Sequence, residues 1–130
     1  MSDRHVTRLY GIRNCDSCRK AMRLLDDLRT DYEFVDLRQS PPGLATLDRW
    51  VEKAATDLLP GWQVLLNRRS RSWQKLDESR RQVDDRGAAC LLMQQNPLLV
   101  KRPVLEASDF FSVGLNPAAM KGHFGKKNKR

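Results

Sequence analysis

The sequence predicts an α/β fold with a mixed four-stranded sheet, in the order strand–helix–strand, a helical insert, two strands and a last helix. Two observations support this prediction. The segments 7–12 and 32–37 have the composition of strands and flank a helical pattern, which is the order of a parallel βαβ unit with a right-handed crossover. After a long helical stretch, the extended segments 104–105 and 110–115 fit a hairpin that leads into a helix over 117–124.

Apolar spacing predicts the helices. In the segment 16–29, one face carries four apolar side chains at positions i, i+3, i+4 and i+7: Ala21, Leu24, Leu25 and Leu28. Proline and glycine break the chain at 41–43, and helical spacing then predicts helices over 44–58 and 78–95, joined through a short turn and the basic loop 67–72. The positions expected to face inward in these two helices are Leu47, Val51, Ala54, Leu58, Val83, Ala88, Leu91 and Leu92.

Length and charge limit the organisation of the chain. A chain of 130 residues fits a single domain. We place this domain at 1–124, with the helical insert at about 43–95, and interpret 125–130 as a disordered basic tail. The formal net charge of +8 attracts phosphate in general, but the tail lacks interleaved aromatic residues and no nucleic-acid module is recognisable. We therefore expect no nucleic-acid partner.

The composition also bears on location. No segment approaches the roughly 18 to 20 apolar residues that a membrane-spanning helix needs, so we expect no membrane partner. The polar residues 1–5 lack the apolar stretch of a secretory signal. Three cysteines, two of them closely spaced, fit a reducing compartment better than a disulfide scaffold. The sequence therefore predicts a cytoplasmic protein.

Cys15 and Cys18 carry most of the functional information in the chain. They lie where the first predicted strand passes into the first predicted helix. At such a junction the unpaired backbone N–H groups and the positive end of the helix dipole favour a thiolate. Cys15 is therefore predicted to have a lowered pKa and to act as a nucleophile, and Cys18, one turn further on, can attack a mixed disulfide formed at Cys15.

Three other interpretations of this pair compete. Zinc would need four ligands, and the remaining candidates, Cys90, His5 and His123, have no metal-ligand spacing, so we expect no metal. A structural disulfide between residues three apart closes too short a loop to stabilise the chain much. Two ordinary buried cysteines would not explain the polar residues around them, which are Asn14, Asp16 and Ser17. Cys90, in an apolar segment, is expected to be an inert core residue.

Four segments, 9–16, 66–69, 72–76 and 99–104, together resemble the arsenate reductase-like family of the thioredoxin fold. The resemblance runs from about Thr7 to Phe124 and is closest to a small subgroup of glutathione-dependent thiol reductases. Spx-type regulators, which bind RNA polymerase, are more distant relatives that also carry a CxxC pair. The resemblance therefore implies a thioredoxin-like fold with a redox-active cysteine.

The resemblance also implies roles for individual residues. Cys15 matches the nucleophilic cysteine of the family. Arg102 matches an arginine that binds the oxyanion and stabilises the thiolate, and Pro103 matches a cis proline that abuts the active-site cysteine. Arg69 matches an arginine of the middle loop with a similar role, although Arg68 beside it leaves the register open by one residue.

Residue chemistry points in the same direction. Arginine stays protonated, and its planar fork binds a carboxylate or an oxyanion at two points. Asn14 has two candidate roles, a hydrogen bond to the thiolate or its anionic substrate and a cap on the helix, and we favour the cap. Asp16 complements the helix dipole but opposes a thiolate at Cys15 through like charge. We assign no histidine base, so catalysis must depend on thiolate stabilisation.

Two departures from the family pattern shape the predicted function. Arsenate reductases use a third arginine shortly after the Arg-Pro pair, whereas 104–115 contains no Arg or Lys. The glutathione-dependent subgroup often lacks a cysteine at the position of Cys18, so that glutathione resolves the intermediate there. We expect a cytosolic glutathione-dependent thiol-disulfide oxidoreductase that acts on a thiol, a disulfide or an oxyanion, with glutaredoxin or another protein as a further partner. The alternative is a redox-switched regulator of Spx type that contacts RNA polymerase without turnover.

Overall fold

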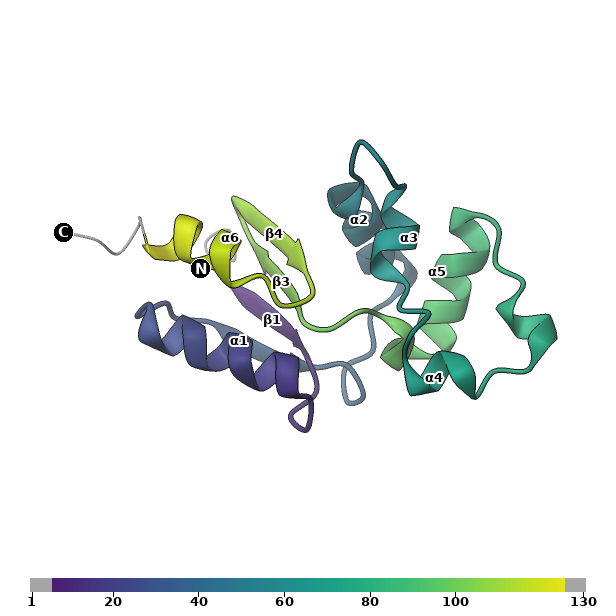
Figure 1. Cartoon of the computed structure of the whole chain (residues 1–130), viewed down its shortest axis with the longest axis horizontal. Helices are drawn as coiled ribbons and strands as arrows, with labels where there is room; N and C mark the ends of the chain where they lie inside the picture. The colour runs from purple at the N-terminus through teal and green to yellow at the C-terminus, as the bar shows by residue number, and fades with distance from the viewer. Residues whose placement is uncertain (1–5, 126–130) are drawn as a thin grey trace. The chain divides into compact units, whose positions relative to one another are not determined.

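The computed structural model describes residues 6–125, which form two compact units (Figure 1). The first unit contains 6–36 and 102–125, and the second contains the continuous stretch 37–101 that is inserted between these two parts. The single domain expected from the sequence stays a prediction. Of the predicted basic tail, Gly125 belongs to the last helical turn and the other residues lie outside the described part. Within 6–125, no helix has both the length and the apolar character that crossing a bilayer requires.

The first unit is built on a four-stranded sheet with the strand order β2-β1-β3-β4. Its strands are β1 (Arg8–Gly11), β2 (Glu33–Asp36), β3 (Val104–Ala107) and β4 (Phe110–Val113). The strands β1 and β2 are parallel, with helix α1 (Asp16–Asp27) between them in the chain, whereas β1–β3 and β3–β4 are antiparallel. The predicted mixed sheet is therefore confirmed.

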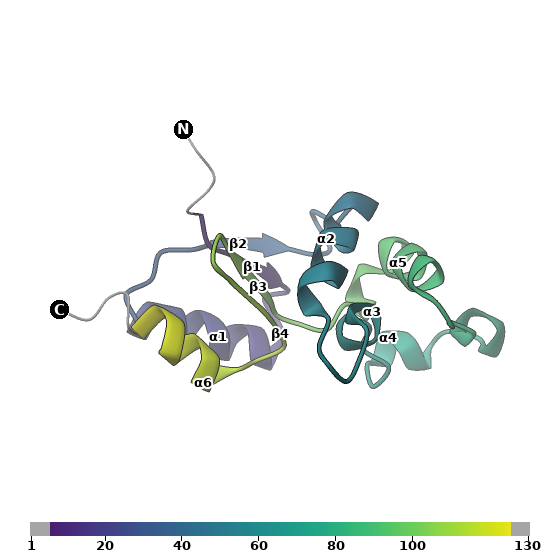
Figure 2. The same cartoon turned by 90° about the horizontal axis from the view of Figure 1, so that it is seen from above.

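Helix α1 and the last helix, α6 (Pro117–Met120), cover the same face of this sheet (Figure 2). The turn η3 (Lys121–Gly125) continues α6. One core cluster joins the sheet to these helices, and its buried members are Leu9, Ala21, Leu25, Leu105, Ala107, Met120 and Phe124. The apolar stripe predicted for the first helix therefore faces the sheet, which fixes the start of α1 next to the end of β1.

The second unit is helical (Figure 1). Its helices are α2 (Leu44–Ala54), α3 (Gly61–Leu65), α4 (Arg71–Gln74) and α5 (Arg86–Gln95), with short turns η1 (Glu78–Arg81) and η2 (Pro97–Leu99). Helix α2 packs against α3 and α5. A side-chain carbon at Gly61 would collide with the backbone carbonyl of Val51, so this glycine allows α3 to begin directly against the backbone of α2.

Helix α2 ends at Ala54, four residues earlier than predicted. Leu58, which was expected to face inward, is 91% exposed. The reason is local, because the hydroxyl of Thr56 accepts hydrogen bonds from the backbone N–H groups of Leu58 and Leu59. This turn gives the chain an alternative to the helix.

The single helix predicted over 78–95 is also wrong, because the structure has two elements there. Asp85 occupies the N-cap of α5 and accepts a hydrogen bond from the N–H of Ala88, so the helix starts at Arg86. This start sets which side chains face the core. The buried residues of α5 are Ala89, Cys90, Leu92 and Met93, whereas Ala88 is exposed and Leu91 is 50% exposed, contrary to expectation.

Candidate functional site

The register of the sheet brings the Arg-Pro pair to the junction between β1 and α1. Tyr10 pairs with Val104 in the antiparallel β1–β3 ladder. The residues that precede Val104, which are Arg102 and Pro103, therefore run alongside the residues that follow Tyr10. This is the end of β1 from which the chain passes to Cys15.

Cys15 occupies the N-cap of α1, with an extended backbone, and its side chain is partly exposed. Burial acts to raise the pKa of the Cys15 thiol, but opposing interactions outweigh it and the net pKa is lowered. These interactions come first from the backbone N–H and the side chain of Cys18, and then from a hydrogen bond to Arg102 and its positive charge. The predicted thiolate at the strand-to-helix junction thus has a physical basis in both the helix end and the guanidinium.

Cys18 has the opposite electrostatic environment. Its side chain is fully buried, and burial is the main cause that raises its pKa from the ordinary 9.0 to about 12. The backbone of Ile12 and the charge of Arg102 favour the thiolate of Cys18, while a hydrogen bond to Cys15 and the charge there oppose it. The two thiols are therefore differentiated, with one poised to ionise and the other held neutral.

Arg102 and Pro103 form the second side of the site. The Arg102–Pro103 peptide bond is cis, as the resemblance implied. Pro103 is buried, and its carbonyl accepts a hydrogen bond of 2.8 Å from the N–H of Gly114. The guanidinium of Arg102 interacts with both cysteine sulfurs, so it supplies a permanent positive charge to the pair.

Two other charged side chains near the junction interact with neighbouring residues. The carboxylate of Asp16 lies 3.2 Å from the ammonium of Lys20, which offsets the like charge that Asp16 presents to Cys15. The guanidinium of Arg13 lies 4.5 Å from the ring centre of Phe34. The expected capping role of Asn14 is wrong, because Cys15 itself is the N-cap residue and Asn14 precedes it.

Arg69 belongs to the second unit, and the structure distinguishes it from its neighbour Arg68. The guanidinium of Arg68 lies 5.8 Å from the ring of Trp62 and 5.6 Å from that of Trp73, and it donates a hydrogen bond to the carbonyl of Val83. Arg68 therefore ties three segments of the second unit together. The side chains of Arg68 and Arg69 are both exposed and both line a pocket, so the two arginines differ in the ring and carbonyl contacts that Arg68 makes.

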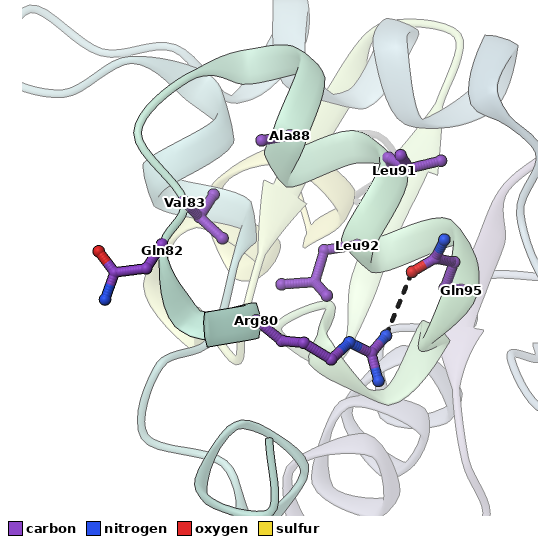
Figure 3. Close-up of a pocket in the computed structure, with 7 residues that line it drawn as sticks. All are labelled: Arg80, Gln82, Val83, Ala88, Leu91, Leu92 and Gln95. Carbon is purple, nitrogen blue, oxygen red and sulfur yellow. Dashed lines mark hydrogen bonds between the residues drawn. The ribbon is translucent and has the colours of Figure 1, made fainter. Parts of the chain in front are cut away.

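Two of the pockets among the described residues lie within the second unit. One is a cavity of about 160 Å³ beside α5, bordered by Leu91 and Leu92 and crossed by a hydrogen bond of 3.2 Å from Arg80 to Gln95 (Figure 3). It lies below the range of roughly 300 to 1,000 Å³ that small-molecule pockets occupy. The other, lined by Arg68, Arg69 and Lys101, has a volume of about 520 Å³. Only the second has both ligand size and positive charge.

No group of three or more His, Cys, Asp or Glu side chains that could hold a metal ion occurs within residues 6–125. His123, the histidine in this part of the chain, pairs with Asp109 at 3.1 Å. The chemistry available at the junction is therefore that of sulfur and guanidinium, in which a thiolate attacks and a cation holds an anionic group.

The sequence interpretation missed the role of Gly11. A side-chain carbon at this position would collide with the sulfur of Cys18, so the absence of a side chain on β1 provides the space for that thiol. The backbone of Ile12, the next residue, also interacts with the sulfur of Cys18. A glycine inside a strand pattern is a recognised sign of close approach, and it was the available signal.

Comparison with known proteins gives a consistent result. The model of the ArsC family matches residues 10–122. An uncharacterized protein of Haemophilus influenzae is 33% identical over 108 residues, which cover 83% of this chain and 90% of that protein.

Two solved structures are similar over nearly their whole length. The YffB (PA3664) protein is 34% identical, with a TM-score of 0.81, and the match covers 92% of this chain and 99% of that one. An arsenate reductase (ArsC) related protein from Brucella melitensis is 36% identical, with a TM-score of 0.66 and coverage of 95% and 98%. The α/β architecture with its mixed sheet is therefore that of the thioredoxin-like proteins of this group.

Proposed function

Because the chain belongs to the ArsC family, we propose that it is a cytoplasmic thiol-disulfide oxidoreductase that uses Cys15 as its nucleophile and glutathione as its reductant. The family membership confirms the resemblance inferred from the sequence and supports an oxidoreductase. The observation that carries the more specific proposal is the meeting of Cys15 with Arg102 at the start of α1, where the thiol pKa is lowered.

The proposed reaction has two exchange steps. The thiolate of Cys15 attacks the glutathione sulfur of a mixed disulfide between glutathione and a substrate thiol. A disulfide forms between Cys15 and glutathione, and the substrate leaves as a thiolate that takes up a proton. A second glutathione thiolate then attacks the sulfur of the glutathione bound to Cys15, which restores the Cys15 thiolate and releases glutathione disulfide. In total, one mixed disulfide and one glutathione thiol give one substrate thiol and one glutathione disulfide, so the electron pair that reduces the substrate comes from the incoming glutathione thiolate.

Arg102 supports both steps. It holds the Cys15 sulfur ionised before attack and stabilises it again as the leaving thiolate in the second step. Its planar fork can also bind a carboxylate of glutathione. Pro103 holds the chain next to Arg102. Asn14, the exposed residue directly before Cys15, remains a proposed contact of the anionic substrate.

Arg69 is proposed as a second anion-binding residue. Both arginines are exposed, and we prefer Arg69 because the guanidinium of Arg68 lies against the rings of Trp62 and Trp73. A third arginine like that of the arsenate reductases is absent from 104–115 in the sequence. We therefore propose a disulfide as the substrate in preference to arsenate.

Cys18 offers a second route for resolving the mixed disulfide between Cys15 and glutathione. Its sulfur interacts with that of Cys15, so it can displace glutathione and leave a Cys15–Cys18 disulfide. Because the pKa of Cys18 is raised to about 12, little of it is ionised near neutral pH. We therefore propose that glutathione resolves the intermediate in ordinary turnover and that the internal disulfide forms when glutathione is scarce.

Trapping tests this proposal. The Cys18→Ser variant, incubated with glutathione disulfide, should gain one glutathione by mass, and peptide mapping should place it on Cys15. The Cys15→Ser variant is the matched control and should remain unmodified, because the remaining Cys18 and Cys90 are both buried and burial raises the pKa of each. Modification of Cys90 with none on Cys15 would exclude the mechanism.

A further inference from the structure

The pocket on the second unit has a composition that selects its ligand. It is lined by eight residues: Leu59, Gln63, Val64, Leu66, Asn67, Arg68, Arg69 and Lys101. Three of them are cationic, and none of the eight is acidic. At about 520 Å³ the pocket falls within the range of ligand sites. It therefore presents positive charge that its own lining does not neutralise.

The backbone that carries the pocket residues is held by hydrogen bonds. Leu66 and Val100 form an antiparallel bridge, with hydrogen bonds of 2.8 Å from the N–H of Asn67 to Leu99 and from the N–H of Lys101 to Leu65. This antiparallel bridge places Lys101 opposite Leu65 and Asn67 opposite Leu99, and Lys101, Asn67 and Arg69 all line the pocket. Preorganised groups lose less entropy on binding than mobile ones.

The loop around Arg69 is fixed by its own hydrogen bonds. The side chain of Asn67 accepts a hydrogen bond of 3.0 Å from the N–H of Arg69, and the hydroxyl of Ser70 donates one of 2.9 Å to the carbonyl of Asn67. Arg68 is held by the two tryptophan rings. Both arginines line the pocket, and the ring contacts of Arg68 leave Arg69 as the arginine that we assign to the ligand.

One part of the pocket wall is apolar. Leu59 is 45% exposed, and the turn made by Thr56 fixes its backbone, with a hydrogen bond of 3.0 Å from the N–H of Leu59 to the Thr56 hydroxyl. Val64, on α3, continues this wall. An inorganic anion would use the cations but would leave this apolar surface in contact with water. A ligand that carries both a carboxylate and an apolar group would cover both.

We propose that this pocket binds an acidic peptide segment in which a carboxylate lies next to an apolar side chain. The carboxylate would accept hydrogen bonds from Arg69 and Lys101, and the apolar side chain would lie against Leu59 and Val64. One part of this inference rests on the proposed function, namely that the peptide belongs to a protein substrate whose disulfide Cys15 would attack. It adds a site that recognises protein substrates. The reaction of Cys15 with glutathione alone does not need such a site.

Titration with a defined probe tests the binding. We would record backbone amide spectra of the full-length protein, labelled with nitrogen-15, during addition of N-acetyl-leucylglutamate. Signals of Asn67, Arg69 and Lys101 should shift. The uncharged diamide of the same dipeptide should bind at least about tenfold more weakly, because it loses charge-assisted hydrogen bonds. Equal affinity for the two probes would overturn the proposal.

Variants separate the pocket from general positive charge. Arg69→Gln and Lys101→Gln should each weaken binding by about tenfold. Arg71→Gln removes the same charge from an exposed position that does not line the pocket, and it should change the affinity by less than about twofold. An equal loss in Arg71→Gln would show that binding is only a long-range charge effect and would overturn the site.

The apolar wall has its own control. Leu59→Ser should weaken binding of the dipeptide but leave the affinity for sulfate unchanged. Tighter binding of sulfate than of the dipeptide would reduce the site to a simple anion pocket and overturn the peptide assignment. The Cys15→Ser variant should bind the dipeptide normally. If the dipeptide binds but no glutathione is trapped on Cys15, only the proposed chemistry is refuted. If glutathione is trapped on Cys15 but the dipeptide does not bind, only this pocket is refuted.

Discussion

The sulfur of Cys18 lies so close to the backbone of Gly11 that any side chain at position 11 would overlap it. This contact joins β1 to the first turn of α1, and it places a neutral thiol directly behind the ionisable thiol of Cys15. The position of the Cys15–Cys18 pair therefore depends on a residue with no side chain of its own.

Substitution of Gly11 by alanine should destabilise the protein by about 1 to 3 kcal/mol, the usual cost of overpacking a core. Urea unfolding of the full chain measures this free energy. Gly122→Ala is the control, because an added carbon there meets no atom within 4 Å. A Cys18→Ala change should reduce the cost of Gly11→Ala, since it removes the sulfur with which the new carbon collides. Additive costs in this double-mutant cycle would contradict the contact.

Arg102→Gln should raise the pKa of Cys15, because it removes one source of thiolate stabilisation. The pH dependence of alkylation at Cys15 by iodoacetamide, followed by mass spectrometry, measures this change. In the wild-type protein the reaction should reach half its maximum rate below the ordinary thiol pKa of 9.0, and in Arg102→Gln the midpoint should move to higher pH. The kcat/KM for a glutathione mixed disulfide should fall by about 10-fold to 100-fold, because a hydrogen bond to a charged group is lost.

Arg23→Gln is the matched control for this experiment. Arg23 is an exposed arginine on α1, and its loss should leave both the midpoint and the kcat/KM unchanged. A fall in kcat/KM without any movement of the midpoint in Arg102→Gln would assign Arg102 to substrate binding alone.

The buried thiol of Cys18 should make the protein less stable at alkaline pH. Above pH 9.0 this thiol ionises in the unfolded chain, whereas in the folded chain its pKa is raised to about 12 and it keeps its proton. The unfolded state then binds fewer protons, so stability falls as pH rises, by up to about 1.4 kcal/mol for each pH unit in this window. Urea unfolding at pH 8, 9 and 10 would follow the loss.

Cys18→Ala provides the reference for this measurement, since alanine does not titrate. The stability difference between the two proteins should shift in favour of the variant as pH rises above 9.0. Parallel curves for the two proteins across this range would exclude a raised pKa at Cys18.

Arg29→Gly should stabilise the protein. Arg29 has a positive φ of 55° at the end of α1, where its N–H bonds to the carbonyl of Asp26 and the N–H of Thr30 bonds to that of Leu25. This is the Schellman pattern, in which glycine is the preferred residue because it has no steric penalty. We expect a gain of about 1 kcal/mol. Arg29→Ala keeps the penalty and should give no such gain in thermal unfolding.

Much of the first unit could be predicted because its signals are local and agree with one another. The apolar stripe of α1 and the alternation in the β2 segment predicted those elements within about two residues of their ends. Cys15 was proposed as the nucleophile because a thiol at a strand-to-helix junction is chemically distinctive, and its role stays a prediction. Arg102 and Pro103 were identified by resemblance, and the β1–β3 register then supplied the physical reason for their place.

The errors lie where side-chain hydrogen bonds override periodicity. Leu58 and Leu91 continue helical patterns in the sequence, but the Thr56 hydroxyl ends one helix early and Asp85 starts another late. The role of Gly11 depends on contact between two elements, so no spacing within one element could reveal it. Sequence patterns predicted which segments fold, while these polar groups decided where each segment stops.

The division of the chain has a consequence for biosynthesis. Strand β1 lies early in the chain, but its neighbour β3 pairs through Leu105 with Leu9 only after the whole of 37–101 has been translated. On the ribosome, the inserted helical unit can therefore fold before the sheet has its central pair of strands. Cys15 can meet Arg102 only after 37–101 has been translated, so the contribution of Arg102 to the lowered pKa of Cys15 is absent from the early nascent chain.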